Sequence, residues 1–414
     1  MTSFIRLRAA LPALALAAGA LGGCIGDQVT DPVSDGLRAT GQDASKAPAK
    51  PRTRTYYIAA DVVDWDYVAP GVGASPGTRD SISGLLFTEH PHAGTFVLPG
   101  PERIGSKYRK ILYREYTDAT FSTLRMDVDP EYRARWEHLG TLGPTIQAQV
   151  GDTIEVVFRN HAEQHVSVHP HGVFYDKDSE GAPYCDGGPR DPDSGQCIGG
   201  VDDAVPPGET VVYTWPVPDR AGPGPADGTS IMWMYHSHTD EVKDTNAGLI
   251  GTIIVVKRGK ITESGQPINV DREFVVLFVV FDENESWLLG ANIDAFAGDA
   301  GSVDPDDDEF VESNLMHAIN GWVYGYQPLR SMTMRQGERV RWYVMGMGTE
   351  VDLHTPHWHG QTGLVGGMRT DIVELLPASM KVFDMEPDNP GIWLFHCHVN
   401  DHINAGMLTR FVVE

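Results

Sequence analysis

Residues 396 to 407, HCHVNDHINAGM, bring one cysteine, three histidines and a methionine close together in the sequence. A type 1 copper ion takes two imidazoles, one thiolate and a weak axial thioether as its ligands. Here Cys397 would supply the thiolate, His402 one imidazole and Met407 the axial sulfur. His396 and His398 flank the cysteine, and in a β-strand they would share the face opposite to it. One strand would therefore serve a copper ion on one side and a second metal site on the other.

Three more histidine pairs with the same spacing occur upstream. They lie in HPHG, in HSH and in HTPHWHG, as His169 with His171, His236 with His238, and His357 with His359. Together with His396 and His398 they make eight imidazoles. His354, three residues before His357, is the candidate for the second type 1 imidazole.

The four histidine motifs, in this order, resemble those of the multicopper oxidases, and MGTEVDLHTPHWHG and PGIWLFHCHVNDH are similar to the ceruloplasmin and hephaestin branch. The resemblance covers about residues 52 to 414. It implies four copper ions per chain. Type 1 copper would be bound by His354, Cys397, His402 and Met407, and type 2 copper by His169 and His357. The type 3 pair would take His171, His236 and His398 on one ion and His238, His359 and His396 on the other.

The resemblance also implies a reaction and an assembly. Electrons taken up at the type 1 site would pass through Cys397 to the histidine cluster, where dioxygen is reduced to water. Two-domain relatives form cyclic homotrimers, with each cluster between the first domain of one subunit and the second domain of the next. A cluster within one chain is the alternative. Asp240, close after the HSH pair, is the candidate proton relay, and an exposed loop aspartate is the other interpretation.

The electron donor is predicted from three further residues. In the ceruloplasmin branch, positions equivalent to Glu312, His317 and Asp401 bind the ferrous ion that is oxidised. Carboxylates and imidazole suit iron, and the acidic run at residues 304 to 309 could concentrate cations. The alternative for Glu312 and His317 is that they are inherited framework residues that bind no iron. The alternative for the acidic run is that it is simply a solvated loop. His90 and His92 form a further HxH pair without the following glycine, and we expect them at the surface.

Short alternating runs between turn residues, such as IQAQVGDTIEVVFRN and REFVVLFVVF, predict strands, and no long helical period separates them. VGDTIEVVFRN with HPHG corresponds to QGERVRWYVM with HTPHWHG, so the chain contains a repeat. We therefore expect an all-β protein. The resemblance implies two cupredoxin-like Greek-key β-sandwich domains, at residues 52 to 257 and 271 to 414, with a linker at 258 to 270.

The first repeat lacks the type 1 ligands of the second. Ser237, Val166 and Leu249 stand where the second repeat has Cys397, His354 and Met407. A hydroxyl does not replace a thiolate, so only the second domain should hold type 1 copper.

The N-terminus is predicted to be a leader and a tether. Residues 1 to 23 are basic and then apolar, and Leu21 to Cys24 read as a bacterial lipobox. Lipid on Cys24 would anchor an exported protein to the periplasmic or cell-surface side of a bacterial membrane; an ordinary secretory signal is the alternative. Residues 24 to 51 read as a flexible tether. Cys185 and Cys197 are expected to pair in an oxidising compartment, or else to be two free thiols.

The net charge of the chain and the number of its candidate copper ligands favour some classes of protein function over others. A net charge of −25 argues against nucleic acid as a partner. We expect an oxidase of Fe(II), or a laccase-like oxidase of phenols and aromatic amines. A copper nitrite reductase would keep its type 1 site in the first domain and needs only three catalytic-site histidines. A non-catalytic copper-binding protein would have lost ligands, whereas all ten copper histidines are present here.

Overall fold

The computed structural model describes residues 50–68, 90, 92–184, 199–349 and 352–414. The predicted leader, Cys24, nearly all of the predicted tether, and the pair Cys185 and Cys197 lie outside the described residues. The chain divides into two units, Met1–Gln42 and Asp43–Glu414, and all of the structure described below belongs to the second, compact unit.

The first half of the unit contains two four-stranded sheets, with strand orders β2-β1-β4-β6 and β3-β8-β7-β5. The strands are β1 (Thr53–Asp66), β2 (Lys107–Tyr116), β3 (Thr145–Gln149), β4 (Thr153–Asn160), β5 (His169–Pro170), β6 (Thr210–Pro216), β7 (Ser230–His236) and β8 (Ile250–Val256). The sequence of β4, TIEVVFRN, alternates, and its apolar residues Ile154, Val156 and Phe158 are fully buried. This is the period-two burial expected of a strand with one face toward a core.

The second half repeats the arrangement, with sheets β10-β9-β12-β16-β14-β15 and β11-β18-β17-β13. The strands are β9 (Arg272–Asp282), β10 (Leu315–Ile319), β11 (Thr333–Met334), β12 (Val340–Gly346), β13 (Pro356–Trp358), β14 (Gly363–Val365), β15 (Met368–Thr370), β16 (Ser379–Met385), β17 (Gly391–Cys397) and β18 (Leu408–Val413). The parallel pairs β1 with β4 and β3 with β8 recur as β9 with β12 and β11 with β18. The repeat predicted from the sequence is thus visible as one strand order used twice, and the all-β prediction is confirmed.

Strand β9 is buried on both faces. Val275, Leu277, Val279 and Phe281 belong to a core cluster that also contains residues of the first half, such as Tyr108 of β2 and Ile250 of β8. The alternate residues Phe274, Val276, Phe278 and Val280 belong to the core of the second half. The continuous apolar run of β9 is explained by this double burial. The domain boundary at residues 258 to 270 stays a prediction, because the two halves form one compact unit.

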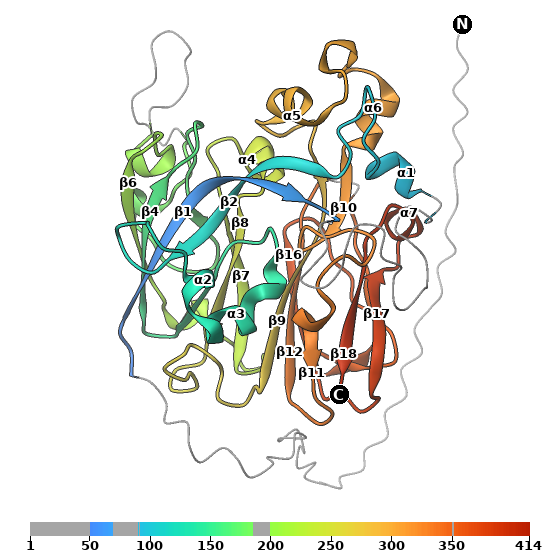
Figure 1. The fold of residues 1–414 in the computed structure, drawn as a ribbon. Coiled ribbons are helices and arrows are strands. Elements are labelled where there is room, and N and C mark those ends of the chain that lie inside the picture. Colours follow the sequence, from blue (N-terminus) through green and yellow to red (C-terminus); the bar gives the residue numbers. More distant parts are fainter. Residues whose placement is uncertain (1–49, 69–89, 91, 185–198, 350–351) are drawn as a thin grey trace, which may run out of the picture. The chain divides into compact units, whose positions relative to one another are not determined.

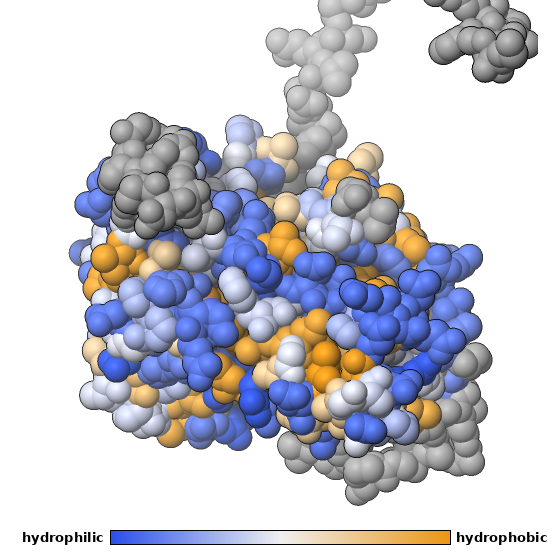
Figure 2. Space-filling view, turned by 90° about the horizontal axis from the view of Figure 1, so that it is seen from above, coloured by the Kyte–Doolittle hydropathy of each residue, from blue (hydrophilic) through white to orange (hydrophobic). Residues whose placement is uncertain are grey.

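Helices are short, and several lie where the sheets end. They are α1 (Ala93–Phe96), α2 (Arg125–Val128), α3 (Pro130–Trp136), α4 (Glu241–Ala247), α5 (Leu289–Phe296), α6 (Asp308–Ser313) and α7 (Asn400–Asn404). In Figure 1, α1, α6 and α7 gather near β10 at the upper right. Figure 2 looks down on the end that carries α5 and α6, where hydrophilic residues cover most of the face. The acidic run at 304 to 309 is exposed in the segment that leads into and begins α6.

Within the described residues, none of the helices combines the length and the apolar character that crossing a membrane requires.

Candidate metal centre

The residues predicted for type 1 copper come together in a buried site at the end of β17. Cys397 is the last residue of β17, His402 lies in α7, and His354 precedes β13. The Nδ1 atoms of His354 and His402 are 3.2 Å apart, and the Cys397 Sγ lies 3.6 Å from the Nδ1 of His402. One donor atom from each of the three residues lies within 4.8 Å of the others. Met407, fully buried, shares the hydrophobic core with Cys397.

Burial keeps this site uncharged. Desolvation lowers the pKa of His354 to about 3 and lowers the pKa of His402, so both imidazoles are neutral near pH 7. Desolvation also raises the pKa of the Cys397 thiol. The Thr355 N–H donates to the Cys397 sulfur at 3.3 Å, which favours the thiolate.

The donor set fits copper. Two neutral imidazole nitrogens and a sulfur converge on one point, and a buried thioether lies in the same core. This combination of borderline and soft ligands is the one that a blue-copper site uses. A bound cation would also oppose the effect of burial on the thiol, because a coordinating thiol loses its proton.

Four histidines of the first half form one cluster. Strand β5 pairs with β7, so that His169 faces His236. Ring centroids among His169, His171, His236 and His238 lie 5.2 to 5.7 Å apart. Backbone carbonyls hold the Nδ1 atoms of His169 and His236, at 2.7 and 3.0 Å. Their Nε2 atoms are therefore left for a metal. Burial lowers the pKa of His171 and of His236 to about 4.

Four histidines of the second half form a matching cluster. Strand β13 pairs with β17, so that His357 faces His396. Ring centroids among His357, His359, His396 and His398 lie 4.8 to 5.5 Å apart. The Nε2 atoms of His359 and His396 are 3.0 Å apart, and the Nδ1 of His396 bonds to the Cys397 carbonyl at 2.7 Å. Cys397 and its two neighbours thus serve opposite sides of β17, as alternation along a strand predicts.

The two clusters stay separate within one chain. Across the described ranges, close imidazole contacts occur inside each cluster, and no hydrogen bond or ring contact joins one cluster to the other. A cavity of about 390 Å³ lies beside the first cluster and is lined by His169, His171, Phe174 and Arg220, among others. Phe174 is 49% exposed there. The predicted type 3 sets, which combine His171 and His236 with His398, or His238 with His359 and His396, are not assembled by a single chain.

The three predicted iron residues lie on neighbouring elements, with different exposure. His317 of β10 is 9% exposed, and its ring centroid lies 5.3 Å from that of His402. Burial lowers the pKa of His317 to about 4, and the Leu315 carbonyl holds its Nδ1 at 2.9 Å. Glu312 of α6 and Asp401 of α7 are exposed. Within the described part of the chain, these three do not form a group of donors within 4.8 Å of one another.

Asp240, the predicted proton relay, begins α4 as its N-cap and pairs with Lys243 at 3.2 Å. Its proposed role stays a prediction.

Sequence reasoning missed its neighbour Asp244, which is fully buried and whose pKa is raised by burial. Asp244 accepts from the Ser237 hydroxyl at 2.6 Å and from the Trp287 indole N–H at 2.8 Å. The signal was present, because Asp244 and His402 each stand two residues before an Asn-Ala-Gly.

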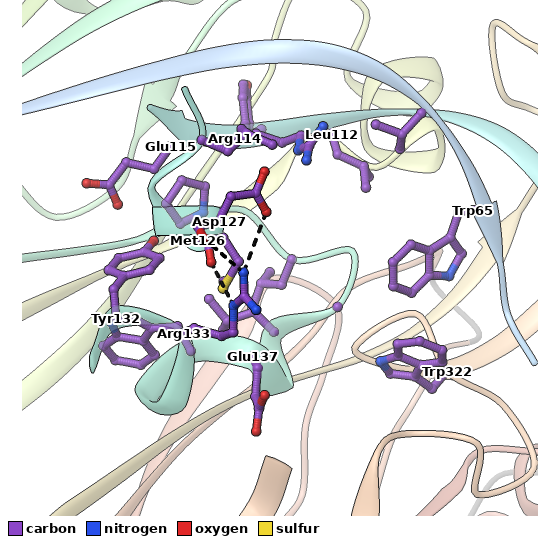
Figure 3. A pocket seen from close by; sticks show the side chains of 18 of the residues that line it. Trp65, Leu112, Arg114, Glu115, Met126, Asp127, Tyr132, Arg133, Glu137 and Trp322 are labelled. Carbon is purple, nitrogen blue, oxygen red and sulfur yellow. Dashed lines mark hydrogen bonds and ion pairs between the residues drawn. The ribbon is translucent and has the colours of Figure 1, made fainter. Parts of the chain in front are cut away.

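A cavity of about 600 Å³ lies apart from these sites. Figure 3 shows it between β1 and β2 on one side and α2, α3 and Trp322 on the other. Trp65 and Trp322 lie with ring centroids 4.7 Å apart at one end, and Arg133 donates to the Met126 carbonyl at 2.8 Å near its centre. The lining that the structure describes contains none of the predicted site residues.

Comparison with known proteins gives two family matches. Models described as multicopper oxidase match residues 139–260 and 304–414. Mouse ferroxidase HEPHL1 is 44% identical over 362 residues, which are 87% of this chain and 29% of that protein. Human ceruloplasmin is 41% identical over 365 residues, 87% of this chain and 30% of that protein. The chain thus spans less than a third of the length of these curated relatives.

Similarity to solved structures supports the fold. A crystal structure of a multicopper oxidase superposes with a TM-score of 0.50 at 16% identity, covering 87% of this chain and 88% of that one. Together with the family matches, it supports the prediction of a cupredoxin-like fold.

The predicted localisation, a lipid anchor on a bacterial membrane, is wrong. The curated relatives include proteins of mouse, human and rat, which conflicts with a bacterial lipoprotein.

Proposed function

Because the chain belongs to the multicopper oxidase family, we propose that it couples the one-electron oxidation of Fe(II) to the four-electron reduction of dioxygen to water. The observation that carries this proposal is the buried site of His354, Cys397 and His402, with His317 beside it and histidines on both sides of Cys397. One end of this arrangement faces a candidate electron donor, and the other faces a candidate oxygen site.

The family implies copper, and we propose four ions per chain. His354, Cys397, His402 and Met407 would hold the type 1 ion, and the eight paired histidines the other three. Copper would supply one-electron redox chemistry at the first site and oxygen binding at the cluster. One peptide bond links Cys397 to His396 and another links it to His398. These bonds give electrons a short covalent route from the type 1 site to the histidine cluster. The carbonyls that hold His169, His236 and His396 fix their tautomers and orient their Nε2 atoms.

For the substrate we propose Fe(II), bound by Glu312, His317 and Asp401. Asp401 is adjacent to His402, and His317 lies against it, so an ion held here would be next to the type 1 site. Carboxylates stabilise Fe(III) relative to Fe(II), which favours release of the electron. The exposed acidic run at 304 to 309 would raise the local concentration of cations.

We propose further that the oxygen-reducing cluster is completed by a second subunit in a cyclic homotrimer. Among the residues that the structure describes, no hydrogen bond or ring contact joins the two four-histidine clusters, and each cluster includes an edge strand of its sheet, β5 or β13. The cavity beside the first cluster and the exposed Phe174 would then face the partner. Light scattering tests this proposal: a stable monomer with full activity would exclude the ring.

The substrate is tested by comparing Fe(II) with a phenolic dye in steady-state oxidation. Glu312→Ala and Asp401→Ala should lower ferrous kcat/KM by about tenfold or more, which is about 1.4 kcal/mol of transition-state stabilisation, with little effect on the dye. If neither change affects either substrate, the iron site is wrong and a laccase-like oxidase is the better description. Copper analysis should give four ions per chain, whereas two would favour a nitrite reductase.

A further inference from the structure

The histidine pair His90 and His92, which we expected at the surface, lies beside the elements that carry the candidate iron site. His92 is the N-cap of α1, and α1 packs against α6, the helix that contains Glu312. Figure 1 shows α1 and α6 together, with α7 and β10 close by. The first half of the chain therefore reaches the site on the second half.

Side-chain contacts hold the segment that follows the pair in place. Phe96 of α1 meets His317 edge to face, with ring centroids 5.5 Å apart. After α1, Arg103 forms an ion pair with Glu309 of α6 at 3.3 Å. These contacts attach the segment to α6 and to β10.

His90 is connected to α7 through Tyr324. The ring of His90 lies 5.3 Å from the ring of Tyr324, and His90 is only partly exposed. The Tyr324 hydroxyl donates to the Asn404 carbonyl at 3.3 Å, and Asn404 is the last residue of α7. Asp401 lies one turn earlier in the same helix. The pair is thus connected to the elements of all three candidate iron ligands.

We propose that His90 and His92 supply imidazole ligands to the ferrous ion at Glu312, His317 and Asp401, an inference that rests on the function proposed above. Two carboxylates and one imidazole leave positions open on Fe(II), and imidazole nitrogen is a ligand that suits it. In each turnover Fe(II) loses one electron to the site at Cys397 and leaves as Fe(III). Four such electrons and four protons convert one dioxygen to two waters.

The two kinds of ligand would act at different stages. Imidazoles from the first half would favour capture of Fe(II), while Glu312 and Asp401 favour the Fe(III) product. Removing the imidazoles should therefore raise KM for Fe(II) more than it lowers kcat. The exposed side chain of His92 is placed to meet an incoming ion.

The test uses the copper-loaded protein and Co(II), a redox-inert substitute for Fe(II), in titration calorimetry. The variants are His92→Ala, His90→Phe and the double variant, because phenylalanine keeps the ring contact with Tyr324 but has no ligand nitrogen. The double variant should bind Co(II) about tenfold more weakly and raise the ferrous KM by a similar factor. Dye turnover should be unchanged. His165→Ala, at an exposed histidine of the first half, is the matched control.

Two other outcomes would overturn the inference in different ways. If the double variant keeps wild-type Co(II) affinity and ferrous KM while Glu312→Ala weakens both, the histidines are not ligands and the proposed function stands. If Glu312→Ala and Asp401→Ala leave ferrous oxidation unchanged, the iron site itself is wrong. Weaker Co(II) binding by the histidine variants would then mark a cation site unrelated to iron oxidation.

Discussion

The two halves of the chain share a backbone arrangement at one position but place different residues on it, Cys397 in the second half and Ser237 in the first. In the second half, the Cys397 N–H donates to the Met407 carbonyl at 3.1 Å, and in the first half the Ser237 N–H donates to the Leu249 carbonyl at the same distance. His354 forms an isolated bridge with Leu375, and Val166 forms one with Val205. The backbone frame of the candidate metal site therefore recurs in the first half, where other residues stand at the candidate ligand positions.

What differs is how the polar groups are satisfied. At the first-half position, Asp244 accepts from the Ser237 hydroxyl and from the indole N–H of Trp287, a residue of the second half. In the second half, two imidazoles and a thiol converge instead, with the Nδ1 atoms of His354 and His402 3.2 Å apart and the Cys397 sulfur accepting from the Thr355 N–H. The backbone frame is thus kept in a half without the candidate type 1 ligands, whereas the donor atoms of the second half are grouped so that they could hold a metal.

The largest effect should come from making the second half resemble the first. Cys397→Ser removes the thiolate ligand, so the blue absorption and its electron paramagnetic resonance signal should vanish. Oxidation of Fe(II) and of the dye should both fall by at least about a hundredfold. The eight histidines are untouched, so about three copper ions per chain should remain. Retention of the blue signal would contradict the assignment of the thiolate.

The reverse substitution is the control. Ser237→Cys places a thiol in the first half, but Asp244, Val166 and Leu249 offer neither imidazole nor thioether around it. We expect no second blue site from this single change. A new blue band would show that the frame alone can assemble one.

The next largest effect is expected in the hydrogen-bond network that Asp244 forms with Ser237 and Trp287. Asp244→Ala leaves the Ser237 hydroxyl and the Trp287 N–H without their acceptor, and should lower the free energy of unfolding by about 3 kcal/mol. Asp244→Asn keeps an acceptor oxygen and should recover most of this loss. Urea unfolding of the copper-loaded proteins measures both. Equal stability of the alanine variant and the wild type would show that the network is dispensable.

The pH dependence of stability should have opposite signs at the two sites in copper-depleted protein. His354 has its pKa lowered to about 3, so its contribution is complete above the ordinary value of 6.5 and is lost as the pH falls toward 3. At pH 5 this amounts to about 2 kcal/mol relative to pH 8. Asp244 has a raised pKa, so its contribution is present at low pH and is lost as the pH rises through that raised value.

Urea unfolding at pH 5 and pH 8 checks the signs with His354→Leu and Asp244→Asn. The first change should reduce the loss of stability on acidification, and the second should increase it. A loss that is the same in His354→Leu and in the wild type would contradict the role given to this histidine.

The smallest effect is expected at the axial position. Met407→Leu copies Leu249 and removes only a weak ligand, so the blue site should persist with a higher reduction potential. Ferrous turnover should change by less than about tenfold. Redox titration of the blue band measures the potential, and a lower potential in the variant would contradict axial ligation by Met407.

The parts of the site that the sequence could predict are those held close by the chain itself, together with His354, which the histidine motifs identified at a distance in the sequence. Cys397, His402 and Met407 are neighbours in the sequence, and strand alternation separates Cys397 from His396 and His398. The repeat in the sequence likewise predicted that the two halves would be alike, and the same strand order recurs in both. Asp244 was not predicted, because its role depends on contacts with Ser237 and with Trp287 of the other half. The position of His90 was also missed, since only the folded chain brings it to Tyr324.

Strand β9 places alternate side chains in two cores, and this limits how the chain could evolve by gene duplication. A chain cut between the halves would leave the first with an uncovered apolar surface where Val275, Leu277 and Phe281 now pack. We therefore expect that neither half folds on its own, and that the two halves together are the smallest unit that gene duplication could add to a longer protein.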